Sequence, residues 1–487
     1  MTRPGMWRLA QVGLLSGICV LAIACVGPDF RRPEPPRVDR YTAEPLPAES
    51  ATAPGPGGAA QRFLLEKEVP RNWWTLFKSE ELNDLVAAAL RANPSMDAAR
   101  ASLRQALENA AAQRGAYLPS VQAGFDASRN HDALGVLSPT LASPESYFNL
   151  FRPGVVVSFV PDVFGGNRRQ VESLLAQAES NRHLLDATYL TLTANVVAAA
   201  IQEAGLRAQI AATERVIALA RDALSVMRRE WELGAIAEGD VFAQESQLAQ
   251  LEAGLPALQR ERLQNEDALA ALTGRLPAQS KPLRLELDGL SLPTDLPLGV
   301  PSRLVERRPD VRAAEAQLHA ATAQLGVSIA NLLPQFVING DIGSSATAMS
   351  ELFRAGTGFW SLGASASQTL FAGGALLHRE RAARDAVDQA AALYKTAVLT
   401  AFQNVADSLQ ALRTDADALN AAARAADASR KSLEVARRQL ELGAVSPLAL
   451  IVAEQAFQQS QVSFAQARAS RLADTAALFQ ALGGSVQ

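Results

Sequence analysis

Few side chains in this sequence could carry out chemistry, and those few are scattered. The two cysteines, Cys19 and Cys25, both lie near the N-terminus, which excludes a disulfide framework or a cysteine-based metal site from the rest of the chain. No histidine falls in an HExxH or H-x3-H spacing, and no nucleophile is paired with a base in a recognisable motif. The four histidines are His131, His183, His319 and His378. We therefore expect neither an enzyme nor a bound cofactor or metal.

Cys25 is the one cysteine whose surroundings indicate a chemical role. A positively charged start precedes an apolar stretch, residues 9–24, that is shorter than the roughly 20 residues a spanning helix needs. This stretch ends in Leu-Ala-Ile-Ala-Cys, and small residues before a cysteine are typical of a bacterial lipoprotein signal. The sequence predicts a signal peptide over residues 1–24 and a covalent lipid on the sulfur of Cys25. An ordinary signal peptide with an incidental cysteine is the alternative.

The composition of the chain excludes gross disorder and wholesale binding of nucleic acid. The chain has 487 residues, of which 48% are hydrophobic and 20% charged, and its net charge is -4. Aromatic residues make up only 6%, and alanine is abundant. Such a composition favours long, closely packed helices. Residues 25–70 are rich in proline, which predicts an extended tether or a strap on the surface, or else plain disorder.

The rest of the chain is a tandem duplication. Pro94 aligns with Pro309 at an offset of 215 residues, and Leu-Gly-Ala at 233–235 aligns with Leu-Gly-Ala at 442–444 at an offset of 209. These matches predict a first repeat over residues 71–296 and a second over 297–487.

Each repeat contains a very long stretch that is compatible with helix. Residues 167–233 include no proline and a single glycine, Gly205, and residues 375–442 include neither. At 1.5 Å per residue, each stretch predicts a helix of about 100 Å. Apolar residues recur every seven positions, which favours a left-handed supercoil. A turn at Gly234 and another at Gly443 predict antiparallel hairpins within one chain, although a free dimeric coiled coil would have the same periodicity.

Two pairs of segments with alternating polarity precede the long helices. They lie within about 117–161 and 336–370, and each segment has one apolar and one polar face. Segments of about ten residues with this alternation are typical of transmembrane β-barrels, although a half-buried soluble hairpin would look alike. After the signal, the sequence holds no run of 18 consecutive apolar residues, so we expect any spanning segment to be a strand. Four strands cannot close a barrel, so several chains must combine to give 8, 12 or 16 strands.

A series of short motifs, in this order and joined to the duplication, resembles the TolC-like outer-membrane factor family, in its OprM/NodT lipoprotein branch of RND efflux systems. The resemblance runs from Cys25 to about Gly484. The motifs are Cys25-Val26-Gly27-Pro28-Asp29-Phe30-Arg31-Arg32-Pro33, Trp73-Trp74-x-x-Phe77, Asn93-Pro94, Arg307-Arg308-Pro309-Asp310-Val311-Arg312-Ala313-Ala314-Glu315, Leu333-Pro334 and Phe371-x-Gly373-Gly374.

This resemblance implies both a fold and a function. It implies a mainly helical protomer that forms a homotrimer, with a 12-stranded β-barrel in the outer membrane, a 12-helix barrel in the periplasm and a mixed α/β collar. It also implies a passive, lipid-anchored channel that docks with a periplasmic adaptor and an inner-membrane RND pump. Drugs or other small molecules would leave the cell through it.

The resemblance places a gate at the tips of the helical hairpins, where Gly234 and Gly443 end the long helices. Asp240 stands where family members carry a gate aspartate. The family's usual tyrosine and arginine partners are replaced by Leu440 and Val445. A simple N-cap beside Gly239 is the alternative role for Asp240.

Three further residues complete the predicted tip. Arg437 and Arg438 lie one turn back from the tip and could replace the missing partners of Asp240. Leu448 matches a ring of leucines in the family, whereas Val452 stands where the family carries an aspartate ring. We therefore expect a hydrophobic constriction at Leu448.

Other functions also fit parts of the sequence. A periplasmic coiled-coil adaptor or structural lipoprotein would explain one helical hairpin, although this chain has two. An exit duct for metal efflux or for type I secretion would share the channel fold. Only five methionines are present, which argues mildly against a relay for copper or silver.

Overall fold

A computed structural model describes residues 26–64, 67–131, 147–279 and 283–483. The predicted signal peptide and Cys25 lie outside the described residues. The chain forms two compact units. Of the described residues, the first unit comprises those within 26–32, 103–181 and 314–394, and the second comprises those within 33–102, 182–313 and 395–483. Each long helix contributes residues to both units.

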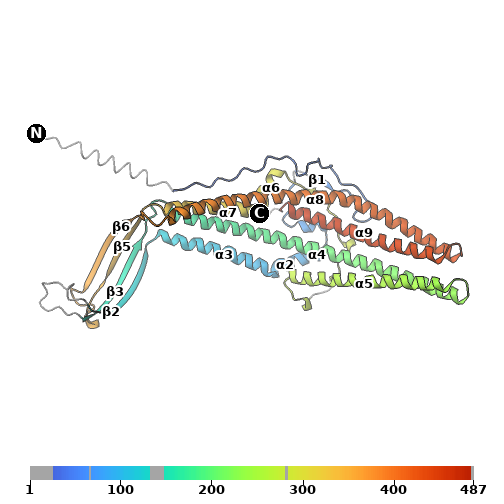
Figure 1. Ribbon diagram of the computed structural model, residues 1–487, viewed down its shortest axis with the longest axis horizontal. Coiled ribbons are helices and arrows are strands. Elements are labelled where there is room, and N and C mark those ends of the chain that lie inside the picture. The colour runs from blue at the N-terminus through green and yellow to red at the C-terminus, as the bar shows by residue number, and fades with distance from the viewer. Residues whose placement is uncertain (1–25, 65–66, 132–146, 280–282, 484–487) are drawn as a thin grey trace. The chain divides into compact units, whose positions relative to one another are not determined.

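The first unit contains one four-stranded sheet, which Figure 1 shows as a single curved layer. Its strands are β2 (Ser120–His131), β3 (Tyr147–Phe159), β5 (Gln335–Ser344) and β6 (Gly358–Ser367). They pair in the order β2-β3-β5-β6, and every pair is antiparallel. The β3–β5 pair joins the two repeats and places Gly154 opposite Gly343. In the described chain β2 and β6 are open edges.

Large apolar side chains of this sheet are exposed. They include Val121 and Phe125 on β2, and Trp360 and Leu362 on β6. Trp360 and Leu362 are two residues apart and therefore share one face of their strand. Exposed apolar surface on a sheet with open edges favours both a lipid environment and pairing with further strands.

Four helices form two antiparallel hairpins (Figure 1). Helix α4 (Gly166–Glu232) is followed by α5 (Glu238–Leu272), and α8 (Ala375–Glu441) is followed by α9 (Pro447–Ala481). The near absence of proline and glycine in α4 and α8 explains their length of 67 residues each. Helix α5 includes Pro256 and continues past it.

The remaining helices and strands are shorter. They are α2 (Glu80–Ala92), α3 (Pro94–Arg114), α6 (Pro301–Arg307), α7 (Pro309–Ala330) and a parallel pair of strands, β1 (Arg62–Leu64) with β4 (Asp295–Pro297). In the second unit, the largest buried apolar side chains include Trp73, Phe77 and Phe479. The ring centroids of Trp73 and Phe479 lie 5.5 Å apart. This aromatic cluster ties the Trp-Trp-x-x-Phe motif to the end of α9.

One helix of the described chain, α4, contains a stretch of 18 residues that is apolar enough, by length and composition, to cross a membrane. Within the chain, 39% of that stretch is buried. The same composition occurs in helices that pack in a protein core, so this property alone assigns no span to α4.

Candidate functional site

The two hairpin tips have the same backbone geometry. Gly234 and Gly443 adopt left-handed conformations, with φ of 73° and 67°. In each turn the glycine N–H donates a 2.8 Å hydrogen bond to the carbonyl three residues earlier, and the following alanine N–H donates one of 2.8 Å to the carbonyl five residues earlier. This is the Schellman arrangement that satisfies the last carbonyls of a helix. A residue with a side chain would be strained at either glycine.

Asp240 lies in the first turn of α5, where a carboxylate is stabilised by the positive end of the helix. The N-cap of α5 is Ala237, so the alternative role of Asp240 as a simple N-cap is wrong. Among the described residues, no ion pair involves Asp240. Leu440, at one of the family's partner positions, instead packs against a buried apolar cluster that includes Leu433 and Leu450.

The two arginines behind the tip have different surroundings. The Nη2 atom of Arg437 lies 3.9 Å from Oε1 of Glu454 and donates a 3.5 Å hydrogen bond to the carbonyl of Leu219. Arg438 is an exposed cation in the last turn of α8, where it stabilises the negative end of the helix. Both arginines line one surface groove together with Leu219 and Phe457.

Apolar side chains are exposed around the second tip. Leu448 is the second residue of α9, and 61% of its surface is accessible. Leu442 and Val452 are also exposed. In the first repeat, at an offset of 209 residues, the position of Leu448 is occupied by Gly239. An exposed leucine at this position is therefore a property of the second hairpin alone.

A buried polar cluster joins the two hairpins just behind the tips. Glu454 on α9 is completely buried and accepts a 3.1 Å hydrogen bond from Nε2 of Gln244 on α5. Nε2 of Gln455 donates a 2.5 Å hydrogen bond to Oε1 of Gln247 beside it. Burial raises the pKa of Glu454, and the nearby Arg437 opposes this shift. This cluster is not predicted from the sequence, although Arg437 and Glu454 repeat Arg228 and Glu245 at an offset of 209 residues.

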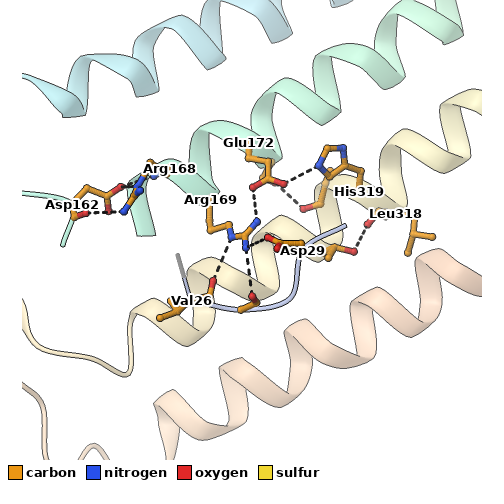
Figure 2. A network of polar contacts seen from close by, with 12 residues as sticks. Val26, Asp29, Asp162, Arg168, Arg169, Glu172, Leu318 and His319 are labelled. Atoms are coloured by element: carbon orange, nitrogen blue, oxygen red, sulfur yellow. Dashed lines mark hydrogen bonds and ion pairs between the residues drawn. The ribbon is translucent and has the colours of Figure 1, made fainter. Parts of the chain in front are cut away.

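A second cluster of polar contacts holds the segment that directly follows Cys25. Figure 2 shows Arg169, near the start of α4, between Asp29 and Glu172. Arg169 Nη2 lies 2.6 Å from Asp29 Oδ1, Nη1 lies 2.8 Å from Glu172 Oε2, and Nε donates to the carbonyl of Val26. His319 Nε2 on α7 contacts Glu172 at 2.9 Å. We call the segment 26–30 together with these side chains the N-terminal clamp.

Close packing of glycine completes the N-terminal clamp. Gly27 has a φ of 90°, and a Cβ added to it would lie 2.6 Å from the Cα of Gly326 on α7. The ring of Phe30 stacks on His319 at a centroid distance of 4.4 Å. The segment after residue 25 is thus fixed beside the start of α4, where Val26 N–H donates to the carbonyl of Phe164. The Val-Gly-Pro-Asp-Phe motif is visible in the sequence, but no sequence signal indicates Arg169 as its partner.

A third polar cluster ties the proline-rich strap to α9 in the second unit. Arg471 is buried and donates to Ser50 Oγ at 3.1 Å and to the carbonyl of Ala59 at 2.8 Å.

Asp415 on α8 lies close to Asp474 on α9. Burial, followed by the hydrogen bond and charge of Asp474, raises the pKa of Asp415 to about 7.

The residues that the structure describes hold no group of three or more histidine, cysteine or acidic side chains placed to bind a metal ion. The geometry described above is that of two long helical hairpins, an open four-stranded sheet and turns at the hairpin tips. This combination defines the fold of TolC-like outer-membrane channels, and it agrees with the fold class that the sequence predicts.

The chain belongs to the outer membrane efflux protein family, whose model matches residues 85–275 and 300–484. It is 28% identical to the pyoverdine export outer membrane protein OpmQ of Pseudomonas putida over 446 residues, which cover 91% of this chain and 94% of OpmQ. It is 26% identical over 478 residues to the toluene efflux pump outer membrane protein TtgC of the same species, covering 98% and 94% of the two chains. The protein is therefore an outer-membrane protein of the efflux type.

Solved structures have the same fold. The outer-membrane channel OprN superposes with a TM-score of 0.84 at 27% identity, over 94% of this chain and 99% of OprN. The outer membrane protein VceC of Vibrio cholerae superposes with a TM-score of 0.78 at 22% identity, over 86% and 99% of the two chains, and this likeness concerns the fold alone. Channels of this class are trimers, and the predicted fold class is confirmed.

Proposed function

We propose that the protein is the passive exit channel of a tripartite efflux system. In this proposal three copies form one conduit, which receives small molecules from an inner-membrane RND pump through a periplasmic adaptor and releases them outside the cell. The observation that carries the proposal is the similarity to export proteins along almost the whole chain, which covers 91% of this protein and 94% of OpmQ.

The open sheet supports a trimer. β2 and β6 leave unpaired backbone groups at both edges of a sheet whose large apolar side chains are exposed. Such edges cannot remain open in lipid. Pairing β6 of one protomer with β2 of the next satisfies both edges, and three protomers close a barrel of 12 strands, as the family resemblance implies.

The cargo in this proposal is a small organic molecule. The printed names of the relatives refer to pyoverdine export in OpmQ and to toluene efflux in TtgC. These names favour two cargo classes, an exported siderophore and an apolar solvent or drug. A passive channel with an exposed leucine at its tip needs no dedicated binding pocket for either class.

The lipid and the gate complete the proposal. The sulfur of Cys25 carries the anchor, and the N-terminal clamp fixes the next residues beside the start of α4, close to the end of β3. Leu448 from each of the three protomers narrows the conduit at the periplasmic tip. The adaptor engages the hairpin tips and moves these leucines apart.

The experiment is deletion of the gene followed by a susceptibility panel. Sensitivity to solvents, antibiotics or dyes should rise and should return to normal when the full chain is supplied from a plasmid. A siderophore assay on the culture medium, run in parallel, distinguishes the two cargo classes. Unchanged tolerance to every compound together with unchanged siderophore release, in cells known to express the protein, would overturn the proposed export role.

A further inference from the structure

A cavity of about 250 Å³ lies in the first unit, where the strands of the sheet meet the helices. We call it the junction cavity. It is bounded by Gln113 on α3, Phe164 just before α4, Asn167 on α4, Val327 on α7 and Phe336 on β5. A single water molecule needs only about 10–15 Å³, so the junction cavity has room for an organic group.

The lining of the junction cavity is partly apolar and partly polar. Val160, which directly follows β3, and Phe336 at the start of β5 are apolar, and the ring centroids of Phe164 and Phe336 lie 6.3 Å apart. Gln113 and Asn167 contribute amide groups from the helices. A mixed lining of this kind suits a ligand in which a carbonyl group adjoins a hydrocarbon chain.

Asn167 offers the junction cavity a hydrogen-bond donor. Its backbone N–H donates a 2.9 Å hydrogen bond to Asp162 Oδ1, and its Oδ1 accepts a 2.5 Å hydrogen bond from Nε2 of Gln113. Its Nδ2 atom is buried and has no hydrogen-bond partner in the part of the chain that the structure describes. A buried donor without an acceptor is costly, and a carbonyl oxygen of a ligand in the cavity would satisfy it.

The N-terminal clamp brings the predicted lipid to this cavity. Val26 directly follows Cys25 in the sequence, and its N–H donates a 3.2 Å hydrogen bond to the carbonyl of Phe164, which lines the cavity. Nε of Arg169 holds the carbonyl of Val26 at 3.3 Å. Consecutive Cα atoms are about 3.8 Å apart, so a lipid on Cys25 begins close to the cavity. Such a short tether gives the lipid a high effective concentration there.

We propose that the junction cavity binds the acyl linkage of the lipid on Cys25. A carbonyl oxygen of the linkage accepts a hydrogen bond from Asn167 Nδ2, and the first methylene groups of the chain pack against Val160 and Phe336. The rest of the chain continues into the membrane around the sheet. A free phospholipid has the same chemistry but lacks the tether, so we assign the cavity to the lipid of Cys25. This inference rests on the proposed lipid anchor and names its binding site on the protein.

The test is photocrosslinking from the lipid itself. Cells that express the full chain are grown with a fatty acid that carries a diazirine near its carboxyl end, which enters their phospholipids and from these the lipid of Cys25. Isolated membranes are irradiated, and the purified protein is digested with trypsin and analysed by mass spectrometry. Cleavage after Arg31 separates the lipopeptide that contains Cys25 from the fragments that line the cavity.

The lipopeptide should be joined to the fragment that contains Val160 and Phe164, and to the fragment that contains Val327 and Phe336. Val327→Trp fills the junction cavity and should lower the yield of these links severalfold. Ser328→Trp is the matched control, because Ser328 is the next residue of α7, is also half-buried and does not line the cavity. Its links should remain at the native yield.

The result with the native chain is decisive and does not depend on the folding of a variant. A labelled lipopeptide that is joined only to phospholipid, or to segments outside the cavity, would overturn the proposed binding site and leave the anchor intact. Cavity fragments that carry a phospholipid without the lipopeptide would also overturn it, because a membrane lipid would then occupy the cavity.

The failure of the anchor gives a different result. A native chain that carries no more probe than Cys25→Ser would overturn the anchor itself, and the binding site with it. The export role is decided by the susceptibility panel, so it stands or falls independently of the crosslinks.

Discussion

Gln244 on α5 and Glu454 on α9 are both buried, and Nε2 of Gln244 donates a 3.1 Å hydrogen bond to Oε2 of Glu454. This contact joins the two hairpins of one protomer a short way behind their tips. At the tip itself, Leu440 and Val445 occupy the positions for which the family resemblance implies a tyrosine and an arginine. The two hairpins are therefore joined by the buried contact between α5 and α9 and by the hydrogen bond of Arg437 on α8 to the carbonyl of Leu219 on α4.

Replacing Glu454 with alanine should loosen the two hairpins. The change leaves the buried Gln244 amide with only the carbonyl of Ala220 as an acceptor, and it removes the carboxylate beside Arg437. We expect the free energy of unfolding to fall by about 1–3 kcal/mol, as measured by urea denaturation of the detergent-solubilised protein. Glu434→Ala is the matched control, because the side chain of Glu434 is 76% exposed. Equal losses in the two variants would show that the buried contact contributes nothing.

The carboxyl pair of Asp415 and Asp474 predicts a pH-dependent stability. Asp415 has a pKa of about 7 in the folded protein, against an ordinary value of 3.8. Between these values the folded state binds more protons than the unfolded state, so stability is lost as the pH rises from about 4 to 7. Asp415 changes the free energy of unfolding by at most about 1.4 kcal/mol per pH unit.

Asp415→Asn should flatten this dependence and should make the variant more stable than the native protein at pH 8. The measurement is urea denaturation at several pH values from 4 to 8. Asp427→Asn serves as the control. Lys431 and Arg430 lower the pKa of Asp427. The charged form of Asp427 therefore stabilises the folded protein at pH values above this pKa, whereas the charged form of Asp415 destabilises it. A native-like slope in Asp415→Asn would contradict the assignment.

Tight packing of glycine in the N-terminal clamp gives a third prediction. Gly27→Ala places a methyl group 2.6 Å from the Cα of Gly326, in a backbone conformation that disfavours side chains. The segment should detach from α7, and trypsin should then cleave after Arg31 severalfold faster. Gly57→Ala is the control, since Gly57 also has a positive φ but has no atom within 4 Å of an added Cβ. Equal cleavage rates in the two variants would refute the role of the Gly27–Gly326 contact.

The sequence predicts the long helices and turns of this fold better than it predicts the polar contacts between distant side chains. The absence of proline and glycine predicts long helices over about 167–233 and 375–442, and the structure has helices over Gly166–Glu232 and Ala375–Glu441. The Leu-Gly-Ala repeats mark both turns. The pairing of Arg169 with Asp29, across 140 residues, depends on how distant segments pack, and no local pattern encodes it. For the same reason the burial of Glu454 could not be read from its type or its neighbours.

The lipid on Cys25 remains a prediction, and Cys25→Ser tests it. Removing the sulfur should abolish labelling of the protein by radioactive palmitate, because acylation of the sulfur requires a cysteine at the cleavage site. Labelling should be retained in Gly27→Ala, which alters the N-terminal clamp and leaves Cys25 in place. Persistent labelling of Cys25→Ser would refute the predicted lipoprotein signal.

The hydrophobic constriction at Leu448 can be tested by giving the second hairpin the residue that the first already carries. Gly239 is the counterpart of Leu448, and helix α5 forms normally with glycine there, so Leu448→Gly should leave the hairpin folded. If three leucines narrow the conduit, their removal should raise the single-channel conductance in planar bilayers severalfold. Leu442→Gly is the control, because Leu442 is also exposed but lies on the other side of the turn. A conductance that matches the native value, or an equal rise in both variants, would place the constriction elsewhere along the conduit.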